Sequence, residues 1–122
     1  MAAPNVVNVT SIYGKTTGLA LTSSVQDILT CPSDKLLKIN SIIVSNVDGI
    51  NNDGVTVSWY DSGTTTSFRL AYTVTVPADS TLIVLGKDSP IYLEEGDKIR
   101  ANGVAASGDL EIIVSYEELD DA

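Results

Sequence analysis

Polar and apolar residues alternate with a period of two along most of the chain, which is typical of β-strands with one buried face. The clearest example is residues 55–60, where Val55, Val57 and Trp59 fall on one side of the predicted strand. The same alternation occurs over residues 70–76 and 110–117. No stretch shows a convincing helical period of 3.6 residues. The pattern therefore predicts a chain built almost entirely from strands.

Short turn signals separate these runs. Asp-Gly, Ser-Gly and Glu-Gly-Asp combinations recur around residues 48–54, 61–63, 95–97 and 107–109, and they favour tight turns. About eight to ten short antiparallel strands at this spacing predict a single all-β domain, a jelly-roll-like β-sandwich. A short helical turn near residues 24–28 is the one expected departure.

The expected domain covers residues 15–118. We expect residues 1–14 to form either an arm that pairs with a neighbour or the first strand. Residues 119–122 form an acidic C-terminal tail, which we interpret as a solvated end.

Three predicted strands, at residues 42–44, 82–85 and 112–114, are apolar on both faces. Either they are central strands or covered by a loop, or another subunit buries the second face, since exposed apolar patches mark association sites. The second interpretation gives a set of candidate interface residues: Ile42, Val44, Ile83, Leu85 and Ile113. The N-terminal arm would add Val6, Val7 and Val9.

The charge of the chain limits its partners. Sixteen acidic residues against seven Lys and Arg give a net charge of −9. Phosphate backbones and anionic membrane surfaces repel such a protein, so we expect neither nucleic acid nor membrane as a partner. No apolar run approaches the roughly 20 residues of a membrane helix, and the N-terminus does not resemble a signal peptide. We expect a soluble protein made in the cytoplasm.

The sequence lacks the residues of the common catalytic and metal sites. There is no histidine, and Cys31, which we expect to be buried and structural, is the only cysteine. Catalytic triads and zinc sites are therefore excluded. Glu94, Glu95 and Asp97 could form an acid–base pair, but all three fall in a predicted turn, where carboxylates are common. We expect no enzyme and no cofactor.

One loop, residues 48–53, is rich in the oxygen ligands that calcium prefers, supplied by Asp48, Asn51, Asn52 and Asp53. The pattern does not match an EF-hand, and the same residue types favour turns without any metal. We therefore favour an ordinary turn and predict no metal site.

The few aromatic residues and the two arginines suggest structural roles. Trp59 is in phase with its apolar neighbours, so we predict that it lies in the core. We expect Arg69 and Arg100 each to pair with a nearby carboxylate, a surface interaction that contributes little to stability.

Residues 76–85, 90–97 and 110–118 resemble small virion proteins of tailed bacteriophages, of the kind carried by phages of cyanobacteria and other marine bacteria. Residues 41–49 and 55–61 fit the same pattern. The resemblance covers about residues 31–118.

The resemblance implies a β-sandwich that assembles on the phage particle, with no enzymatic activity. We expect a capsid decoration (cement) protein that binds the outer capsid surface, with the major capsid protein or other virion proteins as partners. A homo-oligomer is expected, with a trimer favoured. The first alternative is a component of the neck, tail, baseplate or fibre base. The second is a sugar- or calcium-binding module for the host surface.

Overall fold

The computed structural model describes residues 6–7, 9–105 and 108–120, and in this part of the chain all regular structure is β-strand. The all-β prediction is confirmed, with strand number in the expected range. The nine strands are β1 (Ser11–Ala20), β2 (Gln26–Thr30), β3 (Leu36–Asn46), β4 (Asp53–Asp61), β5 (Thr66–Val76), β6 (Thr81–Leu85), β7 (Ile91–Leu93), β8 (Lys98–Gly103) and β9 (Leu110–Asp120).

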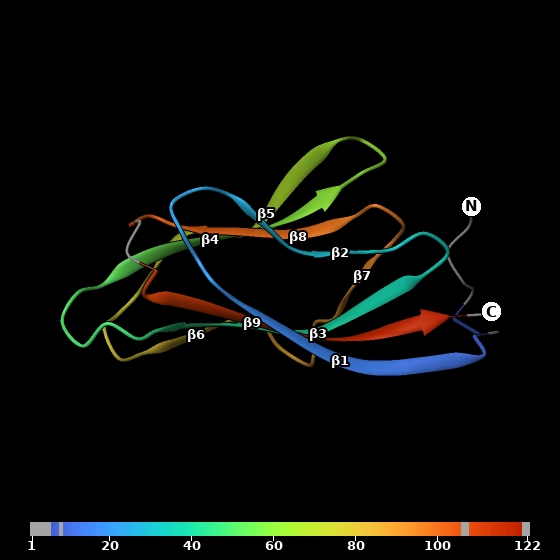
Figure 1. Ribbon diagram of the computed structural model, residues 1–122, viewed down its shortest axis with the longest axis horizontal. Coiled ribbons are helices and arrows are strands. Elements are labelled where there is room, and N and C mark those ends of the chain that lie inside the picture. Colours follow the sequence, from blue (N-terminus) through green and yellow to red (C-terminus); the bar gives the residue numbers. More distant parts are fainter. Residues whose placement is uncertain (1–5, 8, 106–107, 121–122) are drawn as a thin grey trace.

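The strands form two layers that face each other (Figure 1). The first sheet has the order β1-β9-β3-β6, with the short β7 pairing with β3, and the second has the order β2-β8-β4-β5. All neighbours are antiparallel. The predicted antiparallel sandwich is therefore confirmed.

The core lies between the sheets and is filled by alternate residues of the facing strands. Ile42 of β3 and Ile112 of β9 are fully buried in one sheet, and Val55 and Val57 of β4 are fully buried in the other. Burying one such side chain stabilises the fold by roughly 1.5–3 kcal/mol. Because these side chains point into the core, the residues between them on each strand point to the outer face of its sheet.

The first sheet extends beyond both expected boundaries of the domain. β1 pairs with β9 from Ser11 opposite Asp120 to Ala20 opposite Glu111. Leu119 is only 5% exposed, so the chain end assigned to a solvated tail belongs to the sandwich up to residue 120. The boundaries at residues 15 and 118 are corrected for this reason.

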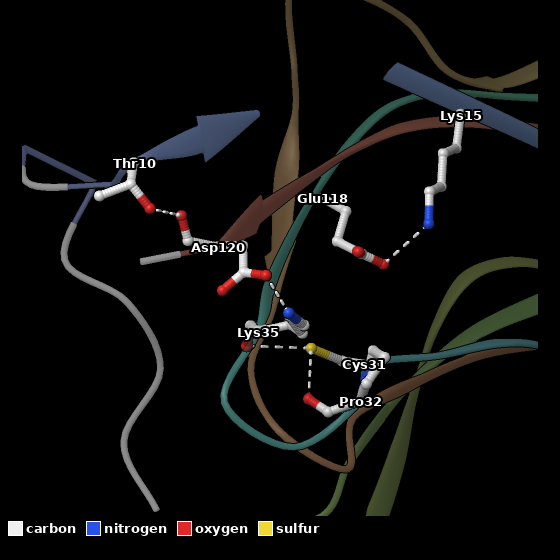
Figure 2. A network of polar contacts seen from close by, with 7 residues as sticks. All are labelled: Thr10, Lys15, Cys31, Pro32, Lys35, Glu118 and Asp120. Atoms are coloured by element: carbon white, nitrogen blue, oxygen red, sulfur yellow. Dashed lines mark hydrogen bonds and ion pairs between the residues drawn. The ribbon is translucent and has the colours of Figure 1, made fainter. Parts of the chain in front are cut away.

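Polar contacts hold the end of β9 in place. Lys35, in the loop between β2 and β3, forms an ion pair with Asp120, and Thr10 donates two hydrogen bonds to the Asp120 carbonyl oxygen (Figure 2). Lys15 of β1 also pairs with Glu118 of β9, at 3.2 Å. Charged side chains at this end of the sheet are therefore fixed by neighbours in the same domain.

The helical turn expected near residues 24–28 is wrong. Gln26 begins β2, which pairs with β8, and Ile28 packs against the core. A five-residue strand is too short for its period to be distinguished from one helical turn in the sequence alone.

A buried carboxylate connects two loops at one end of the sandwich. Asp97 is 2% exposed and accepts hydrogen bonds from the backbone N–H groups of Glu94 (3.1 Å) and Ser62 (3.0 Å) and from the Ser62 hydroxyl (3.1 Å). These bonds join the turn before β8 to the loop between β4 and β5. Of the three carboxylates at residues 94–97, Asp97 thus has a structural role.

Replacing Asp97 by alanine is expected to lower the free energy of unfolding by about 2–3 kcal/mol, because two backbone N–H donors lose a charged acceptor, while the Ser62 hydroxyl keeps the Glu95 carbonyl oxygen at 2.9 Å. Urea denaturation measures this change. The matched control is Glu94→Ala, since the Glu94 side chain is exposed, and its effect should stay within about 0.5 kcal/mol. Equal effects of the two substitutions would contradict the role given to Asp97.

Cys31 is 2% exposed, which confirms the prediction of a buried cysteine. Its Sγ lies 3.3 Å from the carbonyl oxygen of Lys35 and 3.5 Å from that of Pro32 (Figure 2). Burial raises the pKa of the thiol from 9.0 to about 11. Because the thiolate is the reactive form, the Cys31 thiol is protected from reagents while the domain is folded.

Native protein is therefore expected to react with iodoacetamide far more slowly than free cysteine at about pH 8, and at the ordinary rate once unfolded in urea. The raised pKa also makes folding pH-dependent. Its stabilising contribution is complete below pH 9.0 and is lost as the pH rises toward about 11. Rapid alkylation of the native protein would contradict this account.

Candidate interaction surfaces

The outer face of the first sheet carries apolar side chains. Because Ile42 and Ile112 point into the core, the next residues, Ile43 and Ile113, must point outward. Ile113 is 45% exposed, and Ile83 of the neighbouring strand β6 is 67% exposed. Ile43, between them, is half-buried.

Strand register brings these three side chains into one line. Ile43 of β3 lies opposite Ile83 of β6 on one side and opposite Ile113 of β9 on the other. Directly opposite residues have Cβ atoms about 4.5–5.5 Å apart, so the branched side chains contact one another. We call this stripe across the sheet, formed by Ile83, Ile43 and Ile113, the isoleucine row.

The row ends in a recess at the edge strand β1. Gly18 lies opposite Ile113, and a Cβ atom at Gly18 would lie 3.7 Å from Ile113 Cγ1 and only 3.3 Å from the Ile112 carbonyl oxygen. A hollow of about 300 Å³ adjoins it, lined in part by Leu19 and Glu111. The missing side chain leaves room there for an atom group of another molecule.

Polar residues border the isoleucine row. On one side, Ser45 and Thr81 share a hydrogen bond of 3.2 Å, and Glu111 lies opposite Ser45. On the other side, Ser41 lies opposite Ser115. An apolar centre with a polar rim is the usual arrangement of a protein–protein interface.

Three of the five predicted interface residues are corrected by the structure. Ile42 and Val44 are fully buried and Leu85 is 7% exposed, so all three belong to the core. An uninterrupted apolar run contains no polar residue that marks which face points outward. Of the predicted set, Ile83 and Ile113 are at the surface.

Val6 and Val7 are 51% and 83% exposed, and Val9 is half-buried. All three precede β1, which begins at Ser11, so they are outside the first strand. Pairing of this arm with a neighbour stays a prediction, and residues 1–5 and 8 lie outside the described residues.

A second exposed apolar surface, on β5, was not predicted. Phe68, Leu70, Tyr72 and Val74 are between 36% and 65% exposed, although the alternation suggested that the last three share a buried face with Val76. β5 is an edge strand, and its pairing with β4 is interrupted twice by register shifts. The turn end of the β4–β5 hairpin rises away from the upper layer in Figure 1. Such shifts leave no signal in a single sequence.

Trp59 lies near the turn of this hairpin, opposite Phe68 of β5. It is partly buried against the core cluster and stacks on Phe68, with 5.6 Å between ring centroids. Trp59 therefore packs against the core from its margin and is only partly buried, so the predicted core position holds only in part.

The oxygen-rich loop between β3 and β4 uses its oxygens to shape the turn. Asp48 Oδ1 accepts the N–H groups of Ile50 (2.8 Å) and Asn51 (3.1 Å), and these bonds lower the pKa of Asp48. Asp53 Oδ1 accepts the N–H groups of Gly54 and Ala105. Among the described residues, no group of three His, Cys, Asp or Glu is placed to hold a metal ion.

Backbone N–H groups already engage these carboxylates, so calcium is expected to add no stability. Thermal unfolding should give the same midpoint with excess calcium chloride and with EDTA. A calcium-dependent rise of several degrees would show that the loop binds the ion after all, because a ligand that binds only the folded state raises the midpoint.

The described segments contain no helix long and apolar enough to cross a membrane. No protein-family model and no curated protein matches the chain.

Among solved structures, the chain is similar to one in the acidic stable capsid structure of Helicobacter pylori bacteriophage KHP30. The identity is 10%, the TM-score is 0.56, and the match covers 93% of this chain and 91% of that one. Two crystal structures of pentameric capsid proteins from metagenomic phage sequences match at 15% and 16% identity, with TM-scores of 0.37 and 0.39. These two matches cover 97% of this chain and 64% and 65% of the other chains. Their TM-scores are too low to support a shared fold. At such low identity, the first match establishes a shared fold.

Proposed function

We propose that this chain is a structural protein of a phage virion and that it decorates the outer surface of the capsid. The observation that carries the proposal is the isoleucine row, an apolar stripe with two exposed members on a face that no other layer covers among the described residues. The fold shared with a chain of the KHP30 capsid structure supports a place in the particle.

A β-sandwich with an apolar stripe on one outer face suits this role. Burying the row against a neighbouring virion protein, such as the major capsid protein, gains about 25 cal/mol for each Å² removed from water. One such contact is modest, but contacts made by an oligomer add through multivalency. We infer a homo-oligomer, with a trimer favoured, that assembles on the capsid after synthesis in the host cytoplasm.

The proposed role is non-catalytic. The sequence has no histidine to act as a base, and the single thiol of Cys31 is buried with a raised pKa. The most buried carboxylate, Asp97, accepts three hydrogen bonds from its own loops. These features favour a protein that acts by binding.

The double substitution Ile83→Ser and Ile113→Ser is expected to weaken binding to capsids that lack this protein by more than about tenfold, because two apolar contacts are lost. Co-sedimentation with such capsids measures the affinity. The free energy of unfolding should change little, since both side chains are exposed in the free domain.

The matched control is Ile50→Ser, at an 85% exposed isoleucine in the β3–β4 loop, which should bind as the wild type does. Unchanged binding of the double variant would contradict the assignment of the row. Binding of the wild type to tails alone would favour the neck or tail alternative, as would a copy number of only a few per virion.

A further inference from the structure

The outer face of the second sheet gathers positive charge on a strongly acidic protein. Arg69 on β5 and Lys98 and Arg100 on β8 are three of the seven cationic residues of the chain, and they include both arginines. The net charge of the whole chain is −9. This face therefore differs in character from the rest of the molecule.

One aspartate holds two of these cations in place. The Asp27 carboxylate accepts hydrogen bonds from Lys98 Nζ and Arg100 Nε, both at 2.8 Å. The Arg100 guanidinium also lies over the Tyr60 ring, 4.1 Å from its centroid. These two contacts hold the Arg100 guanidinium in position. Asp27 neutralises only one of the two positive charges, so the cluster keeps a net positive charge.

Arg69 departs from the expected pairing with a carboxylate. Its guanidinium lies over the exposed ring of Tyr72, 5.2 Å from the centroid. Within the part of the chain that the structure describes, no carboxylate lies within ion-pair distance of Arg69. The expectation fails because β5 is an edge strand, and the residue opposite Arg69 on its one neighbour in the sheet, β4, is Ser58, whereas Arg100 finds Asp27 on the neighbouring strand β2. Its charge is thus available to a ligand.

A groove of about 480 Å³ lies between the two arginines, within the usual size range of small-molecule sites. Apart from Arg69, Arg100 and Tyr72, the side chains that matter for recognition are hydroxyls and one amide, from Thr56, Ser58, Ser67 and Asn102. Among the described residues, no carboxylate lines the groove.

We propose that this groove binds a carboxylated oligosaccharide. A guanidinium binds a carboxylate through paired N–H donors, and a positioned arginine loses little entropy on binding. Hydroxyl and amide side chains match the hydroxyls of a sugar, and the apolar surface of the 65% exposed Tyr72 packs against a pyranose ring.

The groove suits a saccharide better than a protein surface. Serine is depleted from the core of protein–protein interfaces, whereas this groove presents Ser58, Ser67 and the Asn102 amide beside its arginines. The inference does not depend on the proposed capsid role, because the two surfaces are on opposite sheets.

The test is calorimetric titration of the full chain with two acidic probes, an oligogalacturonate and an oligosialic acid, and with a neutral maltooligosaccharide of matched length. At least one acidic probe is expected to bind more tightly than the neutral one. Arg69→Gln should weaken that binding by about tenfold or more, the loss of a charged bidentate contact. Tyr72→Ala should weaken it as well.

Lys87→Gln is the matched control, since it removes one positive charge from an exposed turn outside the groove and should leave affinity within about twofold. The proposal is overturned if neither acidic probe binds, or if Lys87→Gln weakens binding as much as Arg69→Gln. It is also overturned if polyglutamate binds as tightly, because the groove would then select acidic peptides. Capsid binding is measured on Arg69→Gln as well. Because the capsid role is proposed for the other sheet, this measurement shows whether that role fails independently of saccharide binding.

Discussion

Burial of Ile42, Val44, Ile112 and Val114 between the two sheets is the constraint on which the surface of this protein depends. Side chains alternate along a strand, so these four residues force Ile43 and Ile113 to the outside. A slip of one residue would expose the core set and bury the outer set, at a cost of several kcal/mol. The strand register that buries the core therefore also determines the outward position of the isoleucine row.

The sequence was sufficient for the fold class because period-two alternation and frequent turn signals leave little choice of architecture. It was insufficient for the faces of the apolar strands. Residues 42–44 and 82–85 are apolar throughout, so the interface was assigned to the core residues Ile42, Val44 and Leu85. Register shifts along β3–β6 and β4–β5 also determine which side chains are exposed, including Phe68 and Tyr72. Such irregularities depend on the packing of two strands and cannot be read from either strand alone.

The two outer faces of the sandwich are chemically different. The first sheet presents an isoleucine row framed by serine, threonine and glutamate, and the second presents arginines over tyrosine rings beside a polar groove. A sandwich of two layers leaves both faces uncovered, so each is free to contact a different partner. In our account, the apolar face docks on the particle, and the cationic face stays open to solvent and to acidic sugars.

An electron cryomicroscopy map of the intact virion tests the central claim most directly, because it shows where the domain lies and which face is covered. The account predicts many copies on the capsid shell, each with Ile83, Ile43 and Ile113 buried against a neighbouring chain. A map in which the domain is absent, or in which this face points to solvent while another surface makes the contact, would contradict it.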